Sequence, residues 1–108
     1  MAEKVKDLIE DSGITEYSLN YYLNHRTELG TVKTAKCGPG HLEIEGDEGH
    51  MRLSGCTCGY AGEGPHGTAK ILRDLGVSET DAERIMQAAI FEVLFIHECA
   101  KPIKLEES

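Results

Sequence analysis

A glycine-rich segment at residues 56–67 most constrains what this chain can fold into. It reads Cys-Thr-Cys-Gly-Tyr-Ala-Gly-Glu-Gly-Pro-His-Gly and runs directly into an apolar helical pattern that begins at Thr68. Glycine at this density indicates tight turns or a close approach of the backbone to another group. Pro65 suits the first turn of a helix because proline has no amide hydrogen. The segment therefore predicts a strand, a glycine loop and the start of a helix.

The glycine loop is the leading candidate for a binding site. Amide groups in the first turn of a helix lack partners within the helix, and they bind phosphate or carboxylate groups. The loop is neither a P-loop nor the G-x-G-x-x-G motif of a dinucleotide-binding unit. We expect it to engage a protein partner or a small anionic ligand; a structural turn is the alternative. The predicted ligand-binding residues are Tyr60, Gly62, Gly64, His66 and Gly67.

The same loop has a resemblance to known sequences. Gly59-Tyr-Ala-Gly-Glu-Gly-Pro65, continued by Ala69 and Leu72, resembles the Gly-Tyr-Gly-Gly-x-Gly-Pro signature of small uncharacterised bacterial and phage proteins. Ala61 stands where the signature has a further glycine. The resemblance covers residues 59–72 and implies a similar strand–loop–helix unit, without implying an activity.

Regular apolar patterns lie on both sides of the loop. Before it, apolar and charged residues alternate around a turn at residues 46–49, which predicts a β-hairpin. The apolar positions of this hairpin are Leu42, Ile44, Met51 and Leu53. After it, residues 68–75 carry the stripe of an amphipathic helix.

The last apolar segment predicts a second C-terminal helix. Thr80 and Glu83 fit a capping box, with Ser78 as a competing cap. Residues 85–96 are apolar almost throughout, which is typical of a helix buried in its own domain or against a second copy of the chain. We therefore expect the 85–96 helix either to be covered by its own domain or to form a homodimer interface.

The length of 108 residues favours a single small domain. Residues 1–30 predict a helical hairpin, residues 31–100 an α+β body and residues 101–108 a flexible tail. The predicted fold class is α+β, with an N-terminal helical hairpin, a small antiparallel sheet and two C-terminal helices packed on one sheet face.

The N-terminal segment offers a DNA-binding alternative. The Gly13-Ile-Thr turn and the following Ser18-Leu-Asn-Tyr-Tyr22 resemble the helix-turn-helix of the MerR and TetR families. The resemblance implies a transcriptional regulator whose second helix contacts DNA. The residues that would make the contact are Glu16, Tyr17, Asn20, Tyr21 and Arg26.

A zinc-binding module is a further alternative. Zinc takes four nitrogen or sulphur ligands in a tetrahedron, and short cysteine and histidine pairs often supply them. The candidate ligands are Cys37, His41, Cys56 and Cys58. Buried cysteines that act as small apolar side chains are the other interpretation.

The charge and the N-terminal composition limit the partners. The net charge is −8, and residues 37–108 hold most of the acidic excess, which disfavours nucleic acid and anionic membranes. The first residues lack the apolar stretch of a secretory signal, so we expect a cytoplasmic protein. No set of titratable residues is oriented for catalysis, so we expect a non-enzymatic binding or regulatory protein.

Overall fold

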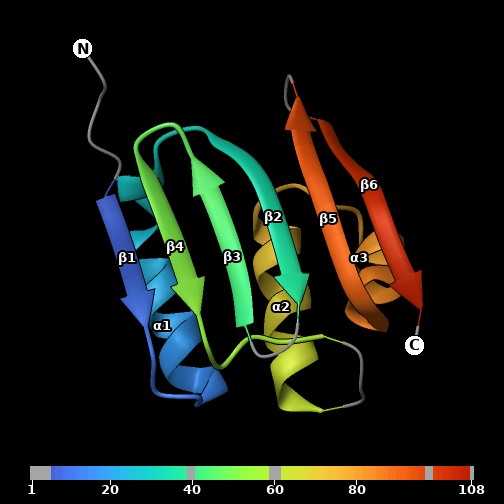
Figure 1. The fold of residues 1–108 in the computed structure, drawn as a ribbon, viewed down its shortest axis with the longest axis horizontal. Coiled ribbons are helices and arrows are strands. Elements are labelled where there is room, and N and C mark those ends of the chain that lie inside the picture. Colours follow the sequence, from blue (N-terminus) through green and yellow to red (C-terminus); the bar gives the residue numbers. More distant parts are fainter. Residues whose placement is uncertain (1–5, 39–40, 59–61, 97–98, 108) are drawn as a thin grey trace.

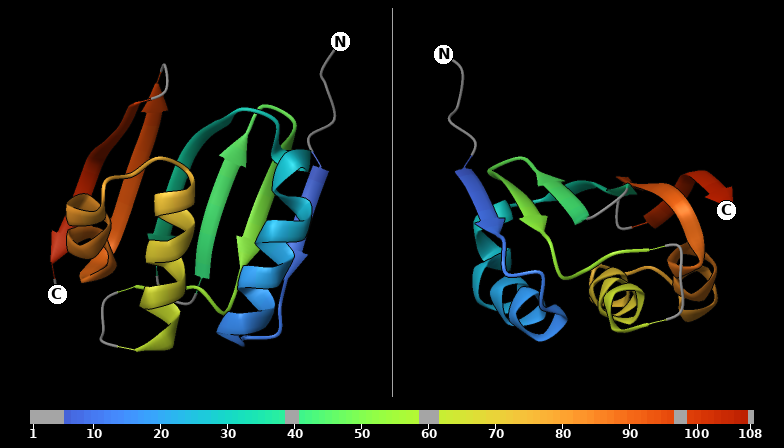
Figure 2. Two further views of the ribbon diagram at one scale, coloured as in Figure 1. Left: turned by 180° about the vertical axis from the view of Figure 1, so that it is seen from behind. Right: turned by 60° about the horizontal axis from the view of Figure 1, so that its bottom comes forward.

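The computed structural model describes residues 6–38, 41–58, 62–96 and 99–107. They form an α+β fold in which helices cover one face of a mixed sheet (Figure 1, Figure 2). The strands are β1 (Lys6–Glu10), β2 (Val32–Gly38), β3 (His41–Gly46), β4 (Gly49–Leu53), β5 (Ala88–Ile96) and β6 (Cys99–Glu107). The helices are α1 (Thr15–His25), the short 3-10 helix η1 (Arg26–Leu29), α2 (Glu63–Asp74) and α3 (Glu79–Met86).

The sheet has six strands in the order β1-β4-β3-β2-β5-β6. Strand β1 pairs in parallel with β4, and the remaining neighbours are antiparallel. The right-hand view of Figure 2 shows α1, α2 and α3 on the same side of this sheet. Apolar side chains on that side form the core, while the opposite side carries polar and charged residues such as Glu43, His50 and Arg52.

The β-hairpin and the helix after the glycine loop are confirmed. Strands β3 and β4 pair in the register Leu42 with Leu53 and Ile44 with Met51, and all four side chains are fully buried. Helix α2 buries the predicted stripe along its length. Both elements depend on contacts between residues close in sequence, which the local pattern records.

The predicted N-terminal helical hairpin is wrong, because residues 6–10 form a strand. Leu8 of β1 is buried in the core, and the amide of Lys6 donates to the Glu48 carbonyl at 3.1 Å. The chain then turns at Gly13, whose φ of 73° lies in the left-handed region. Buried Ser18 holds α1 against this turn by donating to Glu10 at 2.6 Å.

The predicted helix at residues 85–96 is also wrong beyond its first turns. Helix α3 ends at Met86, and the competing cap Ser78 is the residue that accepts from the Asp81 amide, at 3.2 Å. Residues 88–96 form β5 between β2 and β6. Their β-branched and aromatic content suits a strand, and Phe91 and Val93 alternate into the core. The helix expected to form a homodimer interface therefore does not exist.

The sheet is larger than the predicted antiparallel sheet of residues 31–60. It gains β1 in parallel at one edge and β5 and β6 at the other. Residues 101–107, predicted as part of a flexible tail, lie in β6, where backbone pairing with β5 orders them. None of the helices described is long and apolar enough to cross a membrane.

Candidate functional site

Backbone groups in the described part of the glycine loop are hydrogen-bonded to other backbone groups of the protein. Helix α2 begins after Gly62, and the amide of His66 donates to the Gly62 carbonyl at 3.3 Å. The Gly64 carbonyl accepts from the Thr57 amide at 3.2 Å. The amide of His66, one of the predicted ligand-binding residues, is thus engaged within the helix. Tyr60 lies outside the described residues.

Gly67 has a packing role. A Cβ atom at this position would lie 2.6 Å from Thr15 Cγ2 and 3.2 Å from Cys56 Sγ. Contacts shorter than 3.0 Å force a neighbour to move, so only glycine lets α2 approach α1 this closely. Gly67 is buried against α1, away from any ligand that would approach the first turn of α2.

The four candidate zinc ligands do not come together. Cys37 and Cys58 are hydrogen-bonded through their thiols. His41 pairs in register with Gly38, one position from Cys37, so it lies on the opposite sheet face and approaches Glu43 at 3.7 Å. Within the described residues, no group of three or more His, Cys, Asp or Glu side chains is arranged to hold a metal.

The five candidate DNA-contacting residues lie on or next to α1, but they have different surroundings. Tyr17 is exposed, and the Tyr21 ring packs on His25 with ring centroids 4.3 Å apart. Arg26 donates to Asp74 of α2 at 2.6 Å. Glu16 and Asn20 line a groove between α1 and α2. The first helix of a helix-turn-helix is missing, because β1 occupies that part of the chain.

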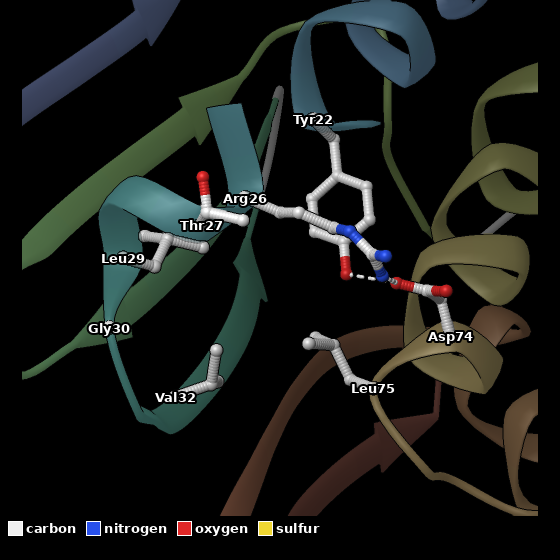
Figure 3. A pocket seen from close by; sticks show the side chains of 8 residues that line it. All are labelled: Tyr22, Arg26, Thr27, Leu29, Gly30, Val32, Asp74 and Leu75. Atoms are coloured by element: carbon white, nitrogen blue, oxygen red, sulfur yellow. Dashed lines mark hydrogen bonds and ion pairs between the residues drawn. The ribbon is translucent and has the colours of Figure 1, made fainter. Parts of the chain in front are cut away.

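Two hollows on the helical side of the sheet share polar lining residues. One is a groove of about 350 Å³ between α1 and α2, and the other is a pocket of about 250 Å³ below the ends of the two helices (Figure 3). Both are lined by Tyr22 and Asp74. The Tyr22 hydroxyl donates to Asp74 Oδ2 at 2.7 Å, and Arg26 donates to the same oxygen.

Helical register explains why the groove forms. Thr15 meets Gly67 at one end of the helix pair, and Tyr22 meets Asp74 at the other. The offset along the chain is the same, 52 residues, in both contacts (67 − 15 and 74 − 22). The contacts are seven residues apart on each helix, or about two turns. The two helices therefore run parallel and in step between these contacts.

The groove walls between these two contacts are mainly apolar. Leu19 faces the groove from α1 and Ile71 faces it from α2, at the same 52-residue offset. Leu23 lines the groove while 56% of its surface remains exposed. Charged side chains stand at the rim. They are Glu16, Lys70 and Asp74.

The polar groups where the two hollows meet already have partners, because Tyr22 and Arg26 both donate to Asp74. Burial, followed by the hydrogen bond to Asp74, raises the pKa of Tyr22 well above its ordinary value of 10.0. The hydrogen bond to Asp74 also raises the pKa of Arg26. Tyr22 therefore stays protonated and Arg26 stays charged at neutral pH.

Comparisons of the chain with protein-family models, with curated proteins and with solved structures found no match.

Sequence reasoning missed the groove and the thiol pair for one physical reason. Tyr22 and Asp74 are 52 residues apart, and Cys37 and Cys58 belong to separate motifs of the chain. Tyr22 joins the core, but no local pattern indicates its partner on α2. For the thiols, pairing by short spacing directed attention to Cys56 and Cys58 instead.

Proposed function

We propose that this protein is a small non-enzymatic binding module that takes an apolar side chain of a partner protein into the α1–α2 groove. The observation that carries the proposal is the exposure of Leu23, 56% of whose surface is open to solvent in a groove lined by Leu19 and Ile71. An apolar side chain of a partner that enters this hollow would remove water from the exposed leucine and from the apolar walls, and burial of that surface stabilises a complex.

The surroundings of the groove favour a contact surface larger than one side chain. Ile14 and Tyr17 of the same helical region are 47% and 56% exposed. Aromatic and large aliphatic side chains are common anchors of protein interfaces. The rim residue Glu16 and the net charge of −8 favour a partner with Lys or Arg beside its apolar anchor.

The other functions have less support. A DNA-binding role would lack the first helix of its motif, and Arg26 is already paired with Asp74. A zinc module would lack a convergent ligand set among the described residues. An anionic ligand at the glycine loop would have to do without the His66 amide.

The proposal is tested by selecting peptides from a random displayed library on the immobilised protein. The expected result is enrichment of peptides with one large apolar residue flanked by Lys or Arg. Leu23→Asp is expected to weaken a selected peptide by at least about tenfold in Kd, because the charge enters an apolar contact.

Ile9→Asp is the matched control. Ile9 is also 56% exposed, and it lies on β1 rather than in the groove. The substitution therefore introduces the same charge at an equally exposed apolar residue away from the groove. It should leave the affinity unchanged. Equal loss of binding in both variants, or library selection without enrichment, would count against the groove. Circular dichroism of both variants checks that the fold is kept.

A further inference from the structure

Two cysteines distant in sequence meet at one edge of the core. Cys37 lies near the end of β2 and is 2% exposed. Cys58 lies half-buried in the segment between β4 and α2, outside any helix or strand. Their thiols interact with each other, and the Cys37 thiol is also placed to donate to the Gly38 carbonyl, at 3.5 Å. Two thiols in contact, one of them accessible from solvent, are the arrangement from which a disulfide forms.

We propose that Cys37 and Cys58 are a reversible dithiol–disulfide pair that a peroxide oxidises. The inference is independent of the groove, since neither residue lines it. Cys58 is the attacking residue because it is the more exposed of the two. Its backbone lies outside the helices and strands.

The environments of the two thiols assign their roles. The hydrogen bond from Cys37 lowers the pKa of Cys58, and the same contact, together with burial, raises the pKa of Cys37. Cys58 thus reaches the thiolate form first, and the thiolate is the nucleophile. Cys37 remains a thiol until Cys58 has reacted.

The reaction balances in two steps. The Cys58 thiolate attacks one peroxide oxygen, the O–O bond breaks, and hydroxide leaves as Cys58 becomes a sulphenic acid. The Cys37 sulphur then attacks the Cys58 sulphur and the S–O bond breaks; the Cys37 proton and the hydroxyl group leave as water. Hydrogen peroxide is reduced by two electrons, and the two thiols are oxidised to one disulfide. A small dithiol reverses the change by exchange.

Cys56 is excluded from the pair by its position. It is fully buried, and burial raises the pKa of its thiol to about 12. Its sulphur packs beside Gly67 at the α1–α2 contact. A disulfide between Cys56 and Cys58 would span a single intervening residue and be strained. Cys56 therefore serves as the internal control.

The disulfide would fasten the end of the sheet to the segment that enters α2. The Thr57 amide donates to the Gly64 carbonyl, and the Thr57 carbonyl accepts from Thr68 at 2.7 Å. The residue beside Cys58 is thus hydrogen-bonded to the first turns of the helix. Oxidation is expected to restrain this helix start relative to β2.

Mass spectrometry of the whole protein tests the proposal. The reduced protein is treated with a small excess of hydrogen peroxide, and unreacted thiols are then alkylated. Trypsin separates Cys37, in the peptide 37–52, from Cys56 and Cys58, which share the peptide 53–70. The expected product is a monomer that has lost two hydrogen atoms, in which these peptides are linked and dithiothreitol releases them.

Single substitutions identify the sulphur atoms. Cys56→Ser should keep the link and Cys58→Ser should lose it. Cys37→Ser should leave Cys58 as a sulphenic acid that dimedone traps. A link that persists in Cys58→Ser, a link to the Cys99 peptide 85–104, a disulfide between two chains, or no link in the wild-type protein would each overturn the proposal. The last two readings come from the unmodified chain, so they hold even where a variant fails to fold.

Discussion

The hydrogen bond between Tyr22 and Asp74 is expected to stabilise the fold by about 1.5 kcal/mol, and Tyr22→Phe measures it. Hydrogen bonds to charged groups contribute about 1.5–3 kcal/mol. Two features place this one at the lower end. The Asp74 side chain is 36% exposed, and its Oδ2 atom keeps a second donor, Arg26, at 2.6 Å. The substitution removes only a hydroxyl, so the buried ring stays in place and leaves little cavity.

A second substitution separates the two interactions that meet on this oxygen. The Arg26–Asp74 pair is about half exposed, with side-chain exposures of 48% and 36%. Ion pairs of this kind contribute about 0.2–1 kcal/mol. Arg26→Met should therefore cost less than Tyr22→Phe. Urea unfolding followed by circular dichroism measures both costs, provided that the m-value stays constant.

The pH dependence gives an independent check on Tyr22. The folded protein holds the pKa of Tyr22 above the ordinary 10.0 of an unfolded tyrosine. Its protonated form therefore stabilises the fold fully below pH 10, and this contribution is lost as the pH rises further. The difference in unfolding free energy between wild type and Tyr22→Phe should shrink as the unfolded tyrosine ionises above pH 10, and it should reverse at still higher pH. A cost for Tyr22→Phe below about 0.3 kcal/mol at neutral pH, or a difference that is constant up to pH 11, would refute the reasoning.

Two further predictions concern the core. Gly46→Ala should destabilise the protein by about 3 kcal/mol or more, because the added Cβ overlaps the Leu29 carbonyl oxygen. Gly38→Ala is the control, since nothing lies within 4 Å of its new atom, and it should change stability by less than about 0.5 kcal/mol. Urea unfolding measures both effects. Equal effects would mean that the backbone yields at Gly46. Burial raises the pKa of Cys56 from 9.0 to about 12, so its protonated thiol stabilises the fold below pH 9 and this contribution falls by roughly 1.4 kcal/mol per pH unit between these values. Thermal unfolding of wild type and Cys56→Ala across this range should show a difference that shrinks as the pH rises; a constant difference would contradict the assignment.

The elements that local pattern predicts are those whose partners are near in sequence. Strands β3 and β4 alternate around a short turn, and each buried residue of one faces a buried residue of the other. Helix α2 carries its own apolar stripe and starts where the glycine loop predicts. Such features need no knowledge of the rest of the chain.

Residues 88–96 show where that reasoning fails. A continuous apolar run is compatible with a buried helix or a buried strand, and the capping signal before it favoured the helix. The deciding interactions are the hydrogen bonds of β5 to β2, which lies more than fifty residues earlier. The same applies to residues 6–10, whose parallel partner β4 comes some forty residues later. In both cases tertiary pairing outweighed local propensity.

The candidate groove depends on the same long-range pairing. Because β1 pairs with β4, α1 is brought onto the sheet face that α2 also covers (Figure 1). Gly67 then allows close contact at one end of the helix pair, and Asp74 holds Tyr22 at the other. These contacts fix the helices in step, so that Leu19 and Ile71 fall between them. A shift of either helix by one residue position would rotate these side chains by about 100° around the helix axis. The groove therefore depends on the alignment of the two helices at the 52-residue offset, and the sequence of neither helix alone determines that alignment.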